Sequence, residues 1–412
     1  MKRFFETRTR QEILDIAAGF QQVGKETVVS TEASGCVLGA DVVSPCDVPH
    51  FSRSTMDGYA VQADDLSRAS VETPVTLRVV GRVEMGHPAD CAVGQGTAVE
   101  VGTGAALPDG ADAVVMIEYT ERLPDNTITV ARPVARHENI VRVGDDFRKG
   151  DTILRAGKRL APKDIAALTS VGATRVDVFK KPVVTIISTG DELVPHEEEP
   201  DIGQIRETNS AVIAALLERD GAVAVYAGIV RDEPDALKEA VESGVARGDM
   251  VLISGGSSVG VRDLTLAALE SFENSEILVH GMATRPGKPT IVARIDGKPA
   301  VGLPGHPVSS LISYEVAVRP ILERLAGCKT GVLHGRSGSV VRARLKRRLP
   351  ALAGRDEYVR VRLEPGDDAL VAVPLGRSSG AVSTLAGADG WVLVDMNSEG
   401  LEAGEEIEVT LF

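Results

Sequence analysis

The chain has 412 residues, a length that predicts roughly two to four domains and a substantial hydrophobic core. Acidic residues outnumber basic ones by 59 to 45, which gives a formal net charge of −14 at pH 7. This charge argues against broad binding to nucleic acid or to an anionic membrane. An anionic ligand would therefore need a local cluster of cations or a metal.

The N-terminal segment contains basic residues but lacks the apolar run of a secretory signal. No stretch reaches the roughly 18 apolar residues that a membrane-spanning helix needs. The four cysteines are not spaced as CxxC pairs, so neither a zinc site nor a disulfide framework is indicated. We therefore expect a cytoplasmic protein that binds no membrane.

The segments before and after residues 181–326 differ in the secondary structure that their sequence predicts. Residues 1–50 begin with an amphipathic helix, and residues 51–140 contain short strand-like runs such as VTLRVVG and TITVARPV. Residues 145–178 are mixed and include the helix-like stretch PKDIAALTSVG. Residues 330–412 return to short strands and turns, which predicts a small β-barrel or sandwich.

Region 181–326 alternates apolar strands with helices of roughly 10–12 residues, which predicts a doubly wound α/β domain with a parallel sheet. The runs VVTII and MVLI are continuously apolar, as expected for strands buried on both faces. Ligands of such sheets bind at the carboxyl ends of the strands. The predicted fold class is α/β plus β.

Acidic loops follow three of these strands and would emerge at one edge of the sheet. Their acids are Asp191 and Glu192 in STGDEL, Asp232 and Glu233 in GIVRDEP, and Asp263 in SGGSSVGVRD. Asp232 and Asp263 also suit helix N-caps, which is the alternative interpretation. Carboxylates about 4 Å apart repel by roughly 1–4 kcal/mol per pair, so a converged set predicts a bound cation, for which Mg²⁺ is the natural candidate.

The glycine-rich loop after MVLIS has the chemistry of an anion site. Gly255 and Gly256 let a ligand approach the backbone, and Ser257 and Ser258 add hydroxyl groups before the next helix. The spacing matches neither the P-loop nor the dinucleotide-binding motif.

Two proline-containing turns add further candidates. In ATRPGKPT, Arg285 and Lys288 lie on either side of a stiff Pro-Gly turn, which suits an oxyanion; the alternative is a solvated hairpin. In GLPGHP, Pro307 begins a helix whose N-terminus is another potential anion site. His306 is more simply a turn residue than a general base, because no second His or acid is adjacent to it.

Seven motifs in chain order resemble the molybdopterin molybdenumtransferase (MoeA) family, which includes the C-terminal domain of gephyrin. The resemblance extends from about residue 5 to the end of the chain. The motifs are SRSTMDGYAV (52–61), VGTGAALPDGADAVVMIE (101–118), STGDEL (188–193), GQIRETNS (203–210), SGGSSVGVRD (254–263), RPGKP (285–289) and GLPGHPVSS (302–310).

The resemblance implies an elongated subunit with four parts. These are a linker domain (1–50 and 140–178), a β-rich lobe (51–139), an α/β molybdopterin-binding domain (179–329) and a C-terminal β-barrel (330–412). It also implies Mg²⁺-dependent insertion of molybdate into adenylylated molybdopterin with release of AMP. The family's homodimers imply a cleft between one subunit's α/β domain and the other's β-rich lobe. The molybdopterin adenylyltransferase is a further candidate partner.

Functional positions of the family can be assigned to single residues of this sequence. The matching catalytic positions are Asp57, Thr103, Glu192, Asp232 and Asp263. Of these, Glu192 and Asp263 match the acids associated with the metal. We expect substrate contacts from Gly190, Asp191, Ser254, Gly255, Gly256, Ser257, Ser258, Arg285, Lys288, Pro304, Gly305, Pro307 and Ser309, with Arg285 and Lys288 near the oxyanion.

The sequence departs from the family pattern at a few positions. Ser52 replaces a common Asp, Ser257 a common Val and His306 a common Asn, so substrate contacts and metal preference stay open, and tungstate is an alternative oxyanion. A molybdopterin adenylyltransferase-type nucleotide enzyme is the main rival function, but it would not need the residues outside the α/β region. A non-catalytic scaffold is a third possibility, against which the retained carboxylates argue.

Overall fold

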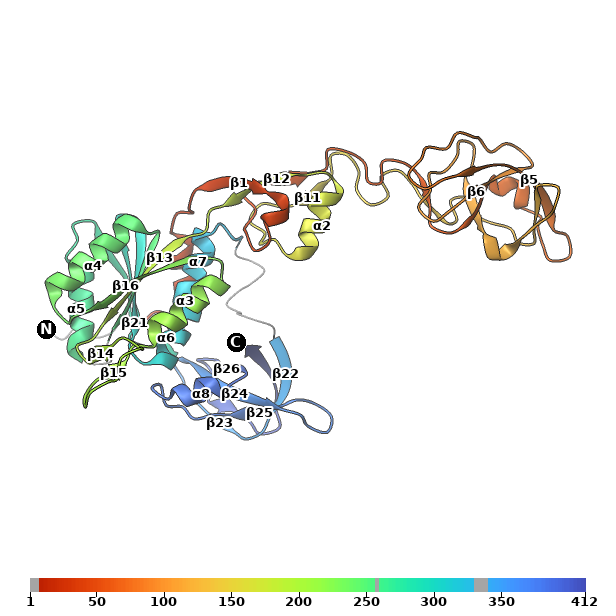
Figure 1. Cartoon of the computed structure of the whole chain (residues 1–412). Helices are drawn as coiled ribbons and strands as arrows, with labels where there is room; N and C mark the ends of the chain where they lie inside the picture. The colour runs from red at the N-terminus through yellow and green to blue at the C-terminus, as the bar shows by residue number, and fades with distance from the viewer. Residues whose placement is uncertain (1–6, 256–258, 330–339) are drawn as a thin grey trace.

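The computed structural model describes residues 7–255, 259–329 and 340–412, and for residues 259–263 the backbone alone. The molecule is elongated: an α/β domain and a β-barrel lie at one end, a β-rich lobe lies at the other, and a linker domain joins them (Figure 1). None of the described helices is both long and apolar enough to cross a lipid bilayer.

The α/β domain is built on a six-stranded sheet in the order β16-β13-β17-β21-β20-β18. Its strands are β13 (Val183–Thr189), β16 (Val223–Val230), β17 (Met250–Gly255), β18 (Ser275–His280), β20 (Ile291–Ile295) and β21 (Lys298–Pro304). Its helices are α3 (Asn209–Arg219), α4 (Pro234–Arg247), α5 (Val259–Glu270), α6 (Pro307–Ser313) and α7 (Arg319–Leu325), with a π-helical turn, η4 (Tyr314–Val318), between the last two.

The predicted parallel sheet is confirmed for β16, β13, β17 and β21, but β20 runs antiparallel to both of its neighbours. The reason is the connection from β20 to β21, which consists of Asp296 and Gly297 alone, both with positive φ (48° and 81°). A two-residue turn of this kind closes a hairpin and cannot cross over to a parallel strand.

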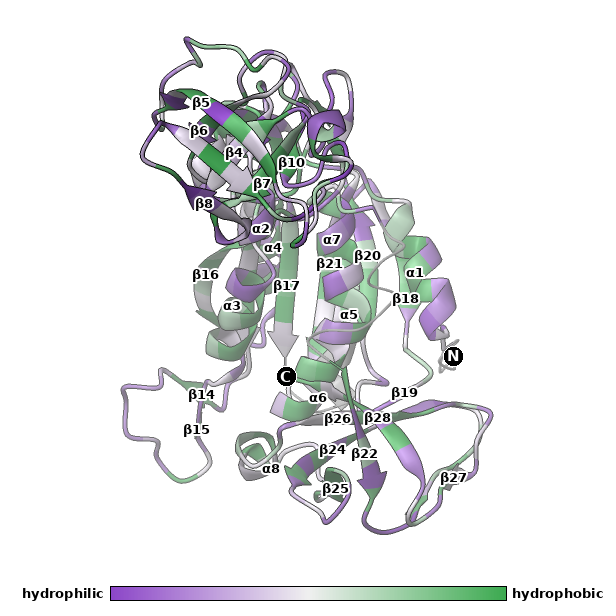
Figure 2. Ribbon diagram, turned by 90° about the vertical axis from the view of Figure 1, so that its right-hand side faces the viewer, coloured by the Kyte–Doolittle hydropathy of each residue, from purple (hydrophilic) through white to green (hydrophobic). Residues whose placement is uncertain are grey.

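Both faces of the sheet are covered, which explains the continuously apolar strands. Ile186 of β13 lies in a core cluster with residues of α3, α6 and α7, whereas the next residue, Ile187, lies in a cluster with residues of α4 and α5. Figure 2 shows the central strands β17 and β21 as largely hydrophobic ribbons. The doubly wound fold class is confirmed.

The first helix, α1 (Arg10–Ala18), starts with a capping box between Thr9 and Glu12. Although residues 1–50 were expected to belong to the linker domain, Ile13 and Phe20 lie in the core cluster of the α/β domain, and α1 packs on α7. The linker domain itself pairs β1 (Lys25–Val29) with β12 (Arg175–Phe179) and β2 (Val42–Val43) with β11 (Thr152–Leu154), and it carries α2 (Pro162–Ser170).

The β-rich lobe is a six-stranded sheet in the order β7-β4-β6-β5-β9-β8. Its strands are β4 (Gly58–Val61), β5 (Val75–Val83), β6 (Thr97–Val101), β7 (Ala113–Met116), β8 (Thr120–Arg122) and β9 (Thr127–Val130). At its base β3 (Arg53–Ser54) pairs with β10 (Ile140–Val141), so the chain enters and leaves the lobe through neighbouring segments.

The C-terminal domain is a closed barrel, because β24 pairs with both β25 and β26 and thereby completes a ring of five strands. The ring consists of β22 (Val340–Leu345), β24 (Asp356–Glu364), β25 (Val371–Pro374), β26 (Gly390–Val394) and β28 (Glu406–Leu411). The smaller elements are α8 (Val382–Ala386), β23 (Leu349–Pro350) paired with β27 (Gly400–Leu401), and, in the α/β domain, β14 (Leu193–Val194) paired with β15 (Ile205–Arg206).

The barrel is joined to the α/β domain by a strand pair and by shared core packing. The short strand β19 (Thr284–Arg285) runs parallel to β24, with Arg285 opposite Glu357. Tyr358 and Trp391 of the barrel belong to the core cluster of the α/β domain. The two domains therefore form one packed unit around the turn that contains RPGKP.

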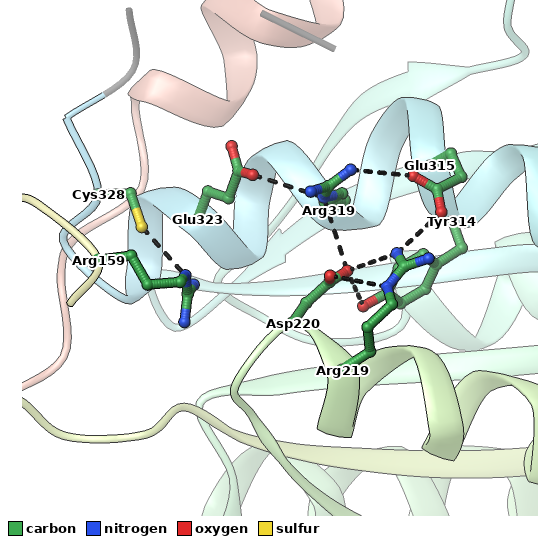
Figure 3. Close-up of polar contacts among 8 residues, drawn as sticks. All are labelled: Arg159, Arg219, Asp220, Tyr314, Glu315, Arg319, Glu323 and Cys328. Carbon is green, nitrogen blue, oxygen red and sulfur yellow. Dashed lines mark hydrogen bonds and ion pairs between the residues drawn. The ribbon is translucent and has the colours of Figure 1, made fainter. Parts of the chain in front are cut away.

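A charged cluster lies where the α/β domain meets the linker domain (Figure 3). This junction cluster consists of Arg159, Arg219, Asp220, Tyr314, Glu315, Arg319, Glu323 and Cys328. Buried Asp220 accepts hydrogen bonds from Nε and Nη2 of Arg219, each at 3.0 Å, and from the Tyr314 hydroxyl at 2.9 Å. Arg319 Nε lies 3.6 Å from the same carboxylate. From the linker domain, Arg159 reaches the Cys328 sulfur at 3.7 Å.

Candidate functional site

The carboxyl ends of three parallel strands meet at Gly255, which pairs with Thr189 of β13 on one side and with Pro304 of β21 on the other. Two cavities open beside them. A cavity of about 350 Å³, here called the Glu192 cavity, is lined by residues that include Glu192, Asn209 and Ser254. A cavity of about 780 Å³, here called the cation cavity, lies between the α/β domain and the barrel. Gly255 and His306 line both, so the cavities are adjacent.

The shape of the Glu192 cavity depends on Gly190 and Asn209. A Cβ atom at Gly190 would come within 2.9 Å of Glu192 Oε2, so a larger residue there would displace that carboxylate. The Asn209 amide donates to Ser254 Oγ and to the Gly305 carbonyl, both at 2.8 Å. Asn209 therefore fixes two predicted substrate-binding residues. This role was not predicted, because a polar residue at the start of a helix normally indicates a cap.

The N-cap alternative is wrong for Asp232 and Asp263, the two acids for which it was considered. The N-cap of α4 is Glu233, while Asp232 Oδ1 accepts a hydrogen bond from Thr189 Oγ1 at 2.7 Å. The backbone N–H of Asp232 donates in turn to Asp191 Oδ1 at 3.3 Å. Helix α5 begins at Val259, so Asp263 lies inside the helix and not at its cap. The side chain of Asp263 and all of residues 256–258 (Gly256, Ser257 and Ser258) lie outside the described part of the chain.

The described acids at these strand ends do not form a metal site by themselves. Among the side chains that the structure describes, no group of three or more His, Cys, Asp or Glu residues is arranged to hold a metal ion. The expected convergence of five carboxylates is therefore not seen for the four acids that can be examined. The predicted Mg²⁺ pair of Glu192 and Asp263 stays a prediction.

The cation cavity brings together basic residues from two domains. Among its described lining residues, five are arginine or lysine: Arg285 and Lys288 from the RPGKP turn, and Arg355, Arg360 and Arg377 from the barrel. The turn thus lines a cavity and pairs with the barrel, although Arg285 and Lys288 themselves are exposed to solvent. This concentration of positive charge contrasts with the net charge of −14 of the whole chain.

Arg360 is the least exposed of these cations, at 3%. Its Nη2 donates to the carbonyls of Gly376 and Ser378, whereas its buried Nε has no hydrogen-bond partner among the described residues. Burial lowers the pKa of the Arg360 guanidinium from its ordinary value. An unsatisfied buried guanidinium N–H is well suited to an entering anion.

The turn before α6 lies between the two cavities. Pro304 and Ser309 line the cation cavity, whereas Gly305 and Pro307 line the Glu192 cavity. His306 is the N-cap residue of α6, and the next N–H in the helix, that of Val308, donates to the Ser379 carbonyl of the barrel at 3.2 Å. This helix end is therefore used in part for docking the barrel, and the predicted anion site there loses one of its donors.

Asp57 and Thr103 form a separate pair in the β-rich lobe. Asp57 Oδ1 accepts hydrogen bonds from the Thr103 backbone N–H at 2.6 Å and from its hydroxyl at 2.9 Å. These two bonds hold the pKa of the exposed Asp57 carboxyl below its usual range. Within one chain the lobe lies at the far end of the linker domain from the α/β domain (Figure 1). Of the other described site residues, Gly190, Asp191 and Asp232 lie beside Thr189 and Glu192 but line neither cavity, and the rest line one or both cavities.

Comparisons with known protein families match the chain along most of its length. Residues 7–172 match the MoeA N-terminal region (domains I and II), residues 185–324 a probable molybdopterin binding domain, and residues 342–412 the MoeA C-terminal region (domain IV). A molybdopterin molybdenumtransferase of Bacillus subtilis is 33% identical over 95% of this chain and 91% of its own. One of Staphylococcus aureus is 32% identical over 93% and 90%.

Solved structures agree with this assignment. Two structures of molybdopterin biosynthesis MoeA proteins from Pyrococcus horikoshii superpose with TM-scores of 0.79 and 0.84, at 38% and 31% sequence identity. They cover 98% and 99% of this chain, and 99% and 100% of their own. The chain belongs to the MoeA family, the molybdopterin molybdenumtransferases of molybdenum cofactor biosynthesis.

Proposed function

We propose that this protein inserts molybdate into adenylylated molybdopterin and releases AMP. The observation that carries the proposal is the pair of adjacent cavities at the carboxyl ends of β13, β17 and β21. One contains the Glu192 carboxylate and the other is lined by five cations. The oxyanion and the substrate's phosphate groups are both negatively charged and repel each other. Preorganised cations in a cavity compensate this repulsion.

In this proposal the substrates occupy different cavities. The oxyanion contacts the cation cavity, where Lys288 and Arg360 lie on opposite domains. The pterin substrate's phosphates contact the edge of the Glu192 cavity, where Asn209 holds Ser254 and Gly305 in place. Gly255, which lines both cavities, lies where the two substrates meet.

The donors in the Glu192 cavity suit Mg²⁺. Its lining includes the Glu192 carboxylate and the Ser254 hydroxyl, and oxygen donors fit this ion better than a softer metal. We propose that Glu192 and Asp263 hold Mg²⁺, which when bound neutralises phosphate charge. Substitution of Asp263 by Asn should leave far-UV circular dichroism unchanged and abolish Mg²⁺-dependent turnover. Turnover near that of the wild type would contradict the assignment.

We also propose that the active protein is a homodimer located in the cytoplasm. The separation of the Asp57–Thr103 pair from the two cavities within one chain supports the idea that a second subunit's lobe completes the site. A monomer in sedimentation at about micromolar concentration would contradict it. The molybdopterin adenylyltransferase is the proposed supplier of the substrate.

A turnover assay with adenylylated molybdopterin tests the reaction. Molybdate and tungstate should each be titrated with and without Mg²⁺, using wild type, Lys288→Ala and the control Lys346→Ala. Lys346 is an exposed barrel residue that pairs with Glu364 and lines neither cavity. AMP release that depends on the oxyanion and is weakened only in Lys288→Ala supports the proposal. ATP consumption without oxyanion dependence would instead support the adenylyltransferase-type alternative.

A further inference from the structure

The cation cavity contains an acid that the proposed reaction does not explain. Among its described lining residues the acid is Glu357 of β24, whose side chain is 2% exposed. Its Oε1 accepts a hydrogen bond from Arg285 Nη1 at 3.0 Å, and its Oε2 lies 3.3 Å from Arg377 Nη1. Because Arg285 comes from the α/β domain and Arg377 from the barrel, one carboxylate joins the two walls of the cavity.

This arrangement has two opposing effects on an entering anion. Glu357 fixes the positions of two guanidinium groups, each of which keeps further N–H donors for a ligand. It also adds a negative charge to a cavity whose purpose would be to attract anions, and it competes with the ligand for Arg285 and Arg377. Maximal affinity would be obtained without this acid, so its position needs a different explanation.

We propose that Glu357 is a positioning residue that orients Arg285 and Arg377 and at the same time limits how tightly the cavity binds a tetrahedral oxyanion. The inference rests on the proposed function in taking an oxyanion as the ligand. Binding that is equally strong in the ground state and in the transition state lowers KM but does not raise kcat. Two guanidinium groups held in fixed orientations therefore favour a higher kcat than two mobile guanidinium groups that bind the oxyanion more tightly.

The variant Glu357→Gln separates affinity from positioning, because it keeps the size of the side chain and removes its charge. Binding of sodium molybdate and of sodium sulfate to the full-length protein should be measured by calorimetry at low and high salt. We expect about fivefold tighter binding of both anions at low salt, a gain that shrinks at high salt as the extra charge is screened. We expect kcat to fall about tenfold while the half-saturating molybdate concentration falls as well.

Two further variants make the test specific. Glu357→Asp keeps the negative charge, but its side chain is one methylene shorter, so its carboxylate holds Arg285 and Arg377 less well. This variant should therefore lower kcat without tightening anion binding. Glu364→Gln, on the same strand, removes a carboxylate that pairs with Lys346 and Arg362 at the surface, and should leave both quantities unchanged. Glu364→Gln changes the net charge of the protein by the same amount as Glu357→Gln, so it controls for the effect of net charge.

The outcomes distinguish this inference from the proposed function. Unchanged or weaker anion binding in Glu357→Gln, with its circular dichroism intact, would overturn the role assigned to Glu357. If Glu357→Gln does not fold, Glu357→Asp decides: tighter binding or an unchanged kcat would overturn the inference. If Glu357→Gln binds sulfate more tightly but the wild type shows no molybdate-dependent turnover, the role of Glu357 in limiting anion binding is supported and the proposed function is refuted.

Discussion

Replacing Asp220 with Asn tests how much the junction cluster contributes to the stability of the α/β domain. The Asp220 side chain is 7% exposed and is approached by two arginines and by the Tyr314 hydroxyl. Asparagine keeps one acceptor oxygen, but its amide group faces N–H donors, and both guanidinium groups lose a buried counter-charge. Breaking a buried charge network by removing one partner costs about 3–5 kcal/mol.

The measurement is thermal and chemical unfolding followed by far-UV circular dichroism, since α3 to α7 belong to the α/β domain. For a unit of roughly 150–250 residues, 1 kcal/mol shifts Tm by about 2–4 °C, so we expect a decrease of about 6–20 °C. Tyr314→Phe should cost less, about 1.5–3 kcal/mol, because it removes a single hydrogen bond to a charged group. The matched control is Glu406→Gln, which breaks an ion pair with Arg342 whose side chains are 63% and 74% exposed, and should cost about 0–1 kcal/mol.

The comparison among these variants shows whether the junction cluster stabilises the α/β domain. If Asp220→Asn unfolds within about 1 kcal/mol of the wild type, like the exposed control, the junction cluster is energetically neutral. The junction cluster would then only orient the linker domain relative to the α/β domain, without stabilising the fold.

Three further predictions concern the site. Thr103→Val removes the hydroxyl hydrogen bond to Asp57 but keeps the backbone one, so the pKa of Asp57 should rise toward its usual range. The acid limb of the pH profile of any activity that needs ionised Asp57 should then move to higher pH, and an unchanged pKa in a carbon-13 titration would contradict this. Asn209→Ala removes one buried and one partly buried hydrogen bond and should lower the free energy of unfolding by about 1–3 kcal/mol, with a rise in KM for the pterin substrate; if both values are retained, the amide does not position Ser254 and Gly305. Lys288→Ala should raise the half-saturating molybdate concentration by roughly one to two decades and leave pterin binding largely intact; equal weakening of both would place Lys288 at the substrate's phosphates.

Local patterns predicted the features that depend on local physics. The apolar runs VVTII and MVLI identified buried strands because a strand covered on both faces has no polar positions, and the structure confirms them as β13 and β17. The strand-end loops predicted the edge at which the cavities open. The antiparallel strand β20 was missed, although Asp296-Gly297 was a readable hairpin signal.

Features that depend on contacts between domains could not be predicted from periodicity. Arg360 alternates with valines in β24 in the same way as an exposed residue would, yet it is buried and lines a cavity between two domains. The pairing of Glu357 with Arg285 joins residues 72 positions apart on different domains. Similarly, Ile13 and Phe20 indicated an amphipathic helix but not which core that helix completes.

The β-rich lobe is attached at two points, which makes it an insertion within the linker domain. The outgoing chain at Val43 pairs with the returning chain at Thr152, and Ser54 pairs with Ile140 closer to the lobe. A module held by two paired strands can tilt as a unit but cannot rotate freely as it would on a single linker. Because the two attachment segments are neighbours, residues 44–151 could be excised and replaced by a short turn, leaving the β1–β12 and β2–β11 pairs intact. The two paired attachment segments therefore make the lobe an inserted unit whose ends meet at one place in the linker domain.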